Sequence, residues 1–204
     1  MSVIRIYHGT TEINLIPSPD WSNSQTDFGP GFYCSFDSDS AKEWACRTYE
    51  NGWVYGYDLD ISGLNVLNLN ESPYDVRYLV ALLVTYRTEE LDPFPSGRKY
   101  DSFMEEYWLD IAGYDAIIGY RPGDPYPEYI NDYFSGKLSI EQLNKAIHLG
   151  AMGNQIALKT QKAFSRLTLV LKENVTREKY YPQYMLKKAN AKNAYQNLSN
   201  GYLL

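Results

Sequence analysis

Polar and aromatic residues stand beside glycines in three separate segments of the chain, a pattern typical of sites that hold a small organic molecule. The first segment is Tyr7-His8-Gly9-Thr10, at the end of a predicted strand. The chain has only two histidines, and a glycine directly after one of them lets a ligand approach the backbone closely. The alternative interpretation is an ordinary strand-end histidine followed by a turn glycine.

The second segment runs from Asp27 to Tyr33 and has a glycine, a proline and another glycine in its middle, at residues 29–31. These residues predict a rigid bend into a short strand that presents the ring and the hydroxyl of Tyr33. A helix with its positive N-terminus nearby is predicted to follow, and its Trp44 could close over a bound aromatic ring. A hairpin-like turn with aromatic residues in the core is the alternative.

In the third segment, Gly153–Thr160, the polar Gln155 opens a predicted strand. A polar side chain at the mouth of a sheet is a reasonable site residue, although it is also an ordinary start of a strand. Arg121 follows another predicted strand and lies in a loop with Asp124. An arginine there could hold a pyrophosphate or an anionic target, or it could simply pair with Asp124 at the surface.

The elements that position these segments follow from hydrophobic periodicity and from capping and breaking residues. Strands are predicted over residues 3–7, 32–36, 53–61, 64–69, 115–120, 155–159 and 168–171. Helices are predicted over residues 37–52, 72–88, 101–112, 139–150 and 161–167, and loops over residues 14–31, 92–100 and 121–129. Because strands and helices interleave without regular βαβ spacing, they favour an α+β fold over a doubly wound one.

The composition predicts a folded domain rather than a fibre, a membrane protein or a disordered chain. Of the 204 residues, 44% are hydrophobic and 22% are charged, which suits one domain, or one domain with an appendage. The net charge of −6 argues against indiscriminate binding of nucleic acid. A membrane-length apolar run and a signal peptide are both missing from the sequence, and two cysteines suit a reducing cytoplasm, so a cytoplasmic protein is expected.

The last part of the chain differs in charge from the rest. Residues 172–204 contain six Lys or Arg and two Glu, which makes +4, whereas residues 1–171 carry −10. We therefore expect a main domain over residues 1–171 and a basic C-terminal extension over residues 172–204, either a helical appendage or a mobile tail. Its charge suggests that it binds an inhibitory partner, such as an antitoxin, or a nucleic-acid target.

Taken together and in this order, the three segments resemble the catalytic domain of the PARP-like (diphtheria-toxin-type) ADP-ribosyltransferases. The resemblance rests on His8-Gly9-Thr10, on Gly29–Tyr33 followed by Ser40-Ala41, and on Asn154-Gln155-Ile156. Residues 3–171 as a whole also resemble an uncharacterised bacterial family, domain of unknown function 3990. The expected fold is therefore an α+β ADP-ribosyltransferase-like fold, in which two small twisted antiparallel or mixed sheets, flanked by helices, form a cleft for NAD.

The resemblance implies which residues would bind NAD. His8 would bond the adenosine ribose, Gly9 would hold the nicotinamide carboxamide through its backbone, and Thr10 would lie beside them. Tyr33, presented by the bend at Gly31, would contact the nicotinamide ribose and ring.

Further contacts to NAD would come from the following helix and from the third segment. Ser40 would touch the nicotinamide amide or Trp44 would supply a second stacking face, as alternatives. Gln155 would bond the 2″-hydroxyl of the nicotinamide ribose, and Arg121 could hold the pyrophosphate. We expect no metal, because the sequence has no Cys/His pair at a spacing suited to metal ligands.

Gln155 departs from the family pattern, which usually has a glutamate at this position. A glutamine can accept a hydrogen bond, but it lacks the negative charge that stabilises a cation or activates an acceptor hydroxyl. Elongation to poly(ADP-ribose) is therefore not expected. Another acid could substitute, and Glu43, Asp124 and Asp132 remain open as candidates.

The function expected from the resemblance is NAD-dependent transfer of a single ADP-ribose to a protein or a nucleic acid, in a toxin-like or phage-conflict role. His8, Tyr33 and Gln155 would be its catalytic residues. Two alternatives remain. The protein could be a catalytically inactive module that binds NAD or ADP-ribose, or an NAD glycohydrolase with water as the acceptor.

Overall fold

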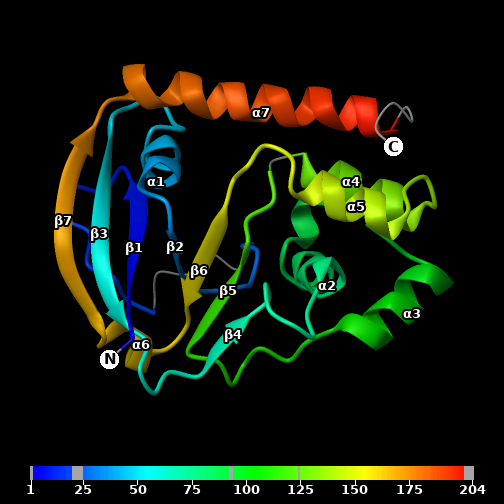
Figure 1. Cartoon of the computed structure of the whole chain (residues 1–204), viewed down its shortest axis with the longest axis horizontal. Coiled ribbons are helices and arrows are strands. Elements are labelled where there is room, and N and C mark those ends of the chain that lie inside the picture. Colours follow the sequence, from blue (N-terminus) through cyan, green and yellow to red (C-terminus); the bar gives the residue numbers. More distant parts are fainter. Residues whose placement is uncertain (1, 20–24, 92–93, 124, 200–204) are drawn as a thin grey trace.

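The computed structural model describes residues 2–19, 25–91, 94–123 and 125–199. Within these ranges the protein is an α+β structure built on one seven-stranded mixed sheet, in the order β4-β5-β6-β2-β1-β3-β7 (Figure 1). The strands are β1 Val3–Thr10, β2 Phe32–Ser35, β3 Gly52–Asp60, β4 Val66–Asn68, β5 Ala116–Tyr120, β6 Asn154–Leu158 and β7 Leu167–Val175. The predicted α+β class is confirmed.

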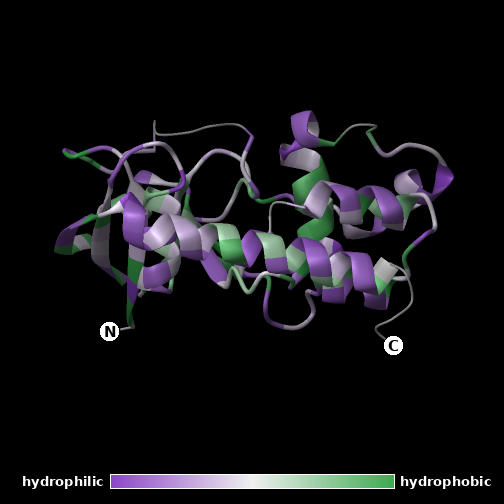
Figure 2. Cartoon of the chain, turned by 90° about the horizontal axis from the view of Figure 1, so that it is seen from above, coloured by the Kyte–Doolittle hydropathy of each residue, from purple (hydrophilic) through white to green (hydrophobic). Residues whose placement is uncertain are grey.

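Helices form a second layer and one end of the molecule (Figure 1). They are α1 Ser38–Ala45, α2 Val76–Tyr86, α3 Arg98–Tyr107, α4 Tyr126–Phe134, α5 Ile140–Ile147, α6 Gln161–Phe164 and α7 Arg177–Ser199, with a short 3-10 helix at Thr88–Glu90. The strongly apolar α2 is buried among its neighbours, whereas α7 is largely hydrophilic (Figure 2). Among the described residues, none of these helices combines the length and the apolar character needed to cross a membrane.

The prediction of two separate small sheets is wrong, because β2 joins the two halves into one sheet. It pairs antiparallel with β6 on one side and with β1 on the other. The contact with β1 is short and is centred on Tyr7 and Ser35, whereas β1 pairs with β3 from Val3 to Thr10. The halves of the sheet therefore meet over a narrow junction, beyond which β1 and β2 separate.

Several element boundaries follow the local sequence closely. Asp37 caps α1 and accepts a hydrogen bond from the backbone N–H of Ser40, as expected for a helix that begins after an aspartate. The predicted capping box at Ser139 is present, with Gln142 returning the hydrogen bond to the backbone. The second predicted helix begins later than expected, because Asp75 rather than Ser72 caps it.

A further helix lies where a loop was predicted. The proline-rich stretch after Arg121 continues into α4, with Pro125 as its N-cap and another proline in its first turn. Proline fits the first helical turn because the N–H groups there have no partner within the helix. The prolines therefore begin this helix instead of preventing it.

The C-terminal part of the chain packs against the main domain. The expected boundary after residue 171 falls inside β7, which pairs with β3 as far as Val175, and residues 177–199 then form α7. Of the two expectations for this segment, the structure shows the helical one. Lys187 pairs with the buried Glu43 of α1 at 2.8 Å, and the Tyr195 hydroxyl donates to Asp132 at 2.6 Å.

Candidate functional site

The separation of β1 from β2 leaves a cleft of about 710 Å³ between these strands, α1, β6 and the end of α2. All the site residues expected from the sequence line this one cleft: His8, Gly9, Thr10, Gly31, Tyr33, Ser40, Trp44, Arg121 and Gln155. Cavities that hold small ligands and cofactors have volumes of roughly 300–1,000 Å³. The three sequence segments therefore meet at a cavity of suitable size.

His8 bridges the two strands where their backbones begin to separate. Its Nδ1 lies 2.7 Å from the backbone oxygen of Tyr33, and its ring stacks on Phe32 at 4.3 Å between centroids. Because a carbonyl oxygen can only accept, Nδ1 carries the hydrogen and Nε2 keeps its lone pair. Burial lowers the pKa of His8 to about 4, against the opposing effect of the backbone hydrogen bond, so the ring is neutral at pH 7. Nε2 can therefore accept a hydrogen bond from a ligand hydroxyl.

Gly9 has a structural reason to be glycine that the sequence did not reveal. A Cβ atom at this position would lie 2.0 Å from the backbone oxygen of Ala41 in α1. The close approach of α1 to β1 therefore requires a residue without a side chain, whatever ligand the backbone also meets. This packing places the first turn of α1 over the end of β1.

Ser40 and Trp44 lie four residues apart on α1 and both line the cleft. Residues at this spacing share one helix face, so the structure makes them neighbours where the sequence suggested alternatives. The Ser40 hydroxyl donates to the carboxylate of Asp37 at 2.8 Å, which fixes its position in the first turn. Trp44 stands one turn further along the same wall of the cleft.

Two arginines lie against the Trp44 ring. The guanidinium carbon of Arg47 is 3.4 Å from the ring centroid, and that of Arg121, which follows β5, is 4.0 Å from it. Such cation–π contacts hold a guanidinium in place, and a guanidinium is a group that suits phosphate. Asp124, the alternative partner expected for Arg121, lies outside the described residues.

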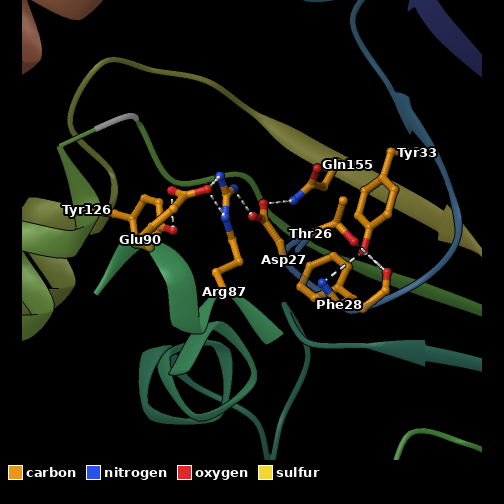
Figure 3. Close-up of polar contacts among 9 residues, drawn as sticks. Thr26, Asp27, Phe28, Tyr33, Arg87, Glu90, Tyr126 and Gln155 are labelled. Atoms are coloured by element: carbon orange, nitrogen blue, oxygen red, sulfur yellow. Dashed lines mark hydrogen bonds and ion pairs between the residues drawn. The ribbon is translucent and has the colours of Figure 1, made fainter. Parts of the chain in front are cut away.

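Tyr33 uses its hydroxyl to hold the loop before β2. The oxygen accepts from the backbone N–H of Phe28 at 2.8 Å and donates to the carbonyl of Gly29 at 2.7 Å (Figure 3). Burial raises the pKa of this phenol, so it stays protonated and keeps both bonds. Of the two features expected from the sequence, the hydroxyl serves the loop, while Tyr33 as a residue lines the cleft.

Gln155 contacts a buried carboxylate that the sequence analysis did not identify as part of the site. The Nε2 atom of Gln155 donates to Oδ2 of Asp27 at 2.6 Å, and only 6% and 4% of these residues is exposed (Figure 3). The other oxygen of Asp27 pairs with Arg87 at 2.5 Å. Burial alone would lower the pKa of Arg87, but the charge of Asp27 and the bonds to both acids raise it overall, so the guanidinium stays charged.

The chain of contacts continues from Arg87 to a second acid. Glu90, in the 3-10 helix after α2, also pairs with Arg87, and its other oxygen accepts from the Tyr126 hydroxyl at 2.7 Å. Asp27, Arg87 and Glu90 all line the cleft. Asp27 begins the glycine-rich second segment and could have been suspected, but no local signal marks Arg87 or Glu90.

The acids suggested as substitutes for a glutamate at position 155 do not lie at the cleft where the structure describes them. Glu43 is committed to Lys187, and Asp132 accepts from Lys137 and Tyr195. Neither residue is part of the cleft lining. Asp124, the remaining suggestion, lies outside the described residues.

Comparison with known proteins gives a family but no activity. Searches of curated proteins and of solved structures found no match. A family model matches residues 4–169, a span that contains all three segments lining the cleft. Because the match covers most of the chain, the protein belongs to the family described as Protein of unknown function (DUF3990).

Proposed function

We propose that the cleft binds NAD and that the protein is an NAD-dependent mono-ADP-ribosyltransferase with an ADP-ribosyltransferase-like fold. The observation that carries the proposal is the meeting of His8, Tyr33 and Gln155 in one cleft, although the first and last are far apart in sequence. These are the residues through which the sequence resembles that superfamily. The two arginines that lie against Trp44 in the same cleft suit a dinucleotide, which carries two phosphates.

In the proposed reaction, the bond between the nicotinamide nitrogen and the ribose carbon C1 breaks. Its electron pair stays with nicotinamide, which leaves as a neutral molecule, and positive charge develops on the ribose. A nucleophilic oxygen or nitrogen of the acceptor then bonds to C1 and loses a proton to solvent or to a nearby base. The protein's task is to hold the dinucleotide bent, retain the leaving group and stabilise the cation.

The polar groups of the cleft suit these tasks. The lone pair on Nε2 of the neutral His8 can accept from a ribose hydroxyl. Arg121 and Arg47, held on Trp44, can face the pyrophosphate. The oxygen of the Gln155 amide can accept from the 2″-hydroxyl, because its nitrogen is already committed to Asp27.

A module that binds NAD or ADP-ribose without turnover is the second candidate, and Gln155 is the observation that favours it. The residue that contacts the reacting ribose would be neutral, and the carboxylate behind it is paired with Arg87. If this candidate is right, Gln155→Glu creates nicotinamide release where the natural protein has none. An NAD glycohydrolase differs from a transferase only in that its acceptor is water.

The experiment that tests the proposal is incubation of the full chain with NAD labelled on the adenylate, with and without cell lysate. Label on protein or nucleic acid supports a transferase and identifies its class of acceptor. Free ADP-ribose alone indicates a glycohydrolase, and binding detected by calorimetry without nicotinamide release indicates a binding module. A protein that neither binds nor cleaves NAD would refute the proposal.

Two variants control this experiment. His8→Ala removes the lone pair offered to the ribose, and the label transferred should fall with it. Asp58→Asn removes a charge at a position outside the cleft lining, where Asp58 pairs with Arg5 at 2.6 Å on the surface of the sheet. Its transfer activity should match that of the natural protein.

A further inference from the structure

Two acids and one arginine lie together beside Gln155, and within this cluster negative charge exceeds positive charge. Asp27 and Glu90 are both paired with Arg87, so this cluster of two carboxylates and one guanidinium carries a net charge of −1. A single glutamate at position 155 would bring the same charge. A negative charge equal to that of a glutamate is therefore present, but it lies on the residues behind Gln155 instead of on residue 155 itself.

The orientation of the Gln155 amide links this charge to the cavity. Its nitrogen donates to Asp27, and the amide oxygen therefore points to the other side of the group (Figure 3). A carboxylate that accepts from one end of an amide polarises it and increases the negative charge on the oxygen at the other end. Asp27 accepts hydrogen bonds only, so it fixes the amide nitrogen of Gln155 on its own side and leaves the amide oxygen on the other.

The cluster is placed rigidly enough to act in this way. Gln155 stands opposite Ser35 of β2 and Gly119 of β5, in the middle of the sheet. Asp27 lies in a loop that Tyr33 pins through two hydrogen bonds. Both side chains are more than nine-tenths buried, and a buried charge acts over a low local dielectric.

We propose that Asp27 is a positioning residue that turns the Gln155 amide oxygen toward the cleft and, together with Arg87 and Glu90, supplies through it the negative charge that stabilises the ribose cation. This inference rests on the proposed function, because it needs NAD to react in the cleft. It explains how a glutamine can serve at a position where a carboxylate is expected. It also gives Arg87 a role, since the arginine holds one oxygen of Asp27 and leaves the other for Gln155.

The first test is Asp27→Asn, measured by nicotinamide release and by calorimetric binding of NAD. Asparagine keeps an oxygen that can accept from Gln155 but loses the charge. We expect kcat to fall by about 10²-fold, the size typical for loss of one group that stabilises transition-state charge. KM should stay within about threefold, because the charge acts on the transition state rather than on bound NAD.

The second test moves the charge instead of removing it. In Asp27→Asn/Gln155→Glu the amide at position 27 can donate to a carboxylate at position 155, so the hydrogen bond is reversed and the charge enters the cleft. We expect kcat to return to the natural value or to exceed it. A purely structural role for Asp27 would not produce this rescue, and melting temperatures of both variants check their folding.

Gln155→Glu alone provides a pH signature. It places two carboxylates at hydrogen-bond distance, so they share a proton and the pKa of one of them is raised. The profile of kcat against pH should gain a titration above about pH 4, the ordinary range of a carboxyl group. This measurement remains available if Asp27→Asn does not fold.

The outcomes separate this inference from the proposed function. An active natural protein whose kcat is unchanged by Asp27→Asn would overturn the inference and leave the function intact. A natural protein that binds NAD without cleaving it, and gains cleavage only in the exchange variant, would also overturn it, because charge relayed through glutamine would then be insufficient. A natural protein without any NAD binding would refute the function itself, and the inference with it.

Discussion

The two ends of the ladder between β5 and β6 each hold a buried acid, and the two acids are used differently. At one end, beyond the pair Ala116 and Leu158, Asp115 accepts from the Thr160 hydroxyl at 2.6 Å, the backbone N–H of Asn65 at 2.8 Å and Lys162 at 3.0 Å. At the other end, Asp27 contacts Gln155 and Arg87, which line the cleft together with it.

The two acids differ in the location of the groups that satisfy them. The partners of Asp115 are a helix cap, a strand start and a surface lysine, so its charge only ties β4, β5 and α6 together. The partners of Asp27 are themselves exposed to a cavity. Burial of a carboxylate therefore does not indicate function by itself, and the groups that satisfy it decide whether it supports the fold or a site.

Removal of the structural acid should have the largest effect on stability. Asp115→Ala deletes the acceptor of three hydrogen bonds, so we expect a loss of about 1.5–3 kcal/mol in the free energy of unfolding, the range for hydrogen bonds to a charged group. Chemical denaturation measures this value. NAD binding at a temperature where the variant is folded should stay unchanged, and a matching loss of binding would break the contrast between the two ends.

At the cleft end, His8→Gln should weaken NAD binding with a smaller cost in stability. The variant loses the ring that stacks on Phe32 and the rigid placement of an acceptor for the ribose. We expect the Kd for NAD to rise by about tenfold, which corresponds to about 1.4 kcal/mol. Calorimetry measures it, and an unchanged Kd with intact nicotinamide release would place the dinucleotide elsewhere.

The pH dependence of stability should separate the two ends. The pKa of His8 is lowered to about 4 by burial, so the unfolded chain takes up a proton first, and stability falls as the pH drops from about 6.5 to about 4. The pKa of Asp115 is lowered to about 2 by its hydrogen bonds from Thr160 and Asn65. Its contribution is present above about pH 4 and is lost between about pH 4 and pH 2.

Urea denaturation at a series of pH values tests both windows. In His8→Gln, the free energy of unfolding should change less between about pH 6.5 and pH 4. In Asp115→Asn, it should change less between about pH 4 and pH 2. If either variant instead reduced the pH dependence in the range assigned to the other residue, the assignment of the two titrations would be wrong.

The smallest effect is expected from Tyr33→Phe. It removes the hydroxyl that joins Phe28 to Gly29 but keeps the ring of this cleft-lining residue. We expect a loss of about 1 kcal/mol in stability, typical of a hydrogen-bonding group. Thermal melting measures it, and NAD binding should change far less than in Tyr33→Ala, in which the ring is also removed. Equal losses of binding in the two variants would assign the hydroxyl a direct role.

Much of the fold could be predicted because local sequence controls it. The strand around Ile6, the cap at Asp37 and the box at Ser139 each follow from residues within a few positions. The loop predicted over residues 121–129 extends too far, because α4 already begins at Tyr126; proline has opposite effects inside a helix and in its first turn, and the sequence does not show where the helix begins. The single sheet was missed because a short junction between β1 and β2 leaves no pattern in the sequence.

The candidate site shows the same division. The residues expected to line a cleft do so, since the three segments that carry them are recognisable from type and spacing. Arg87 and Glu90 could not be predicted as part of the site, because they follow a buried helix and resemble any charged pair at a helix end. The neutral state of His8 depends on packing around its ring, which one sequence does not express.

The polar residues that stand beside glycines at strand ends can be read along the chain, and they indicate which residues to expect at a site. The contact between Gln155 and a carboxylate becomes visible in the folded protein, and this carboxylate is Asp27 rather than Glu43 or Asp132. Local structure depends on neighbours in the chain. The charge around a buried group depends instead on whatever residues folding brings within a few ångströms, at any distance in sequence.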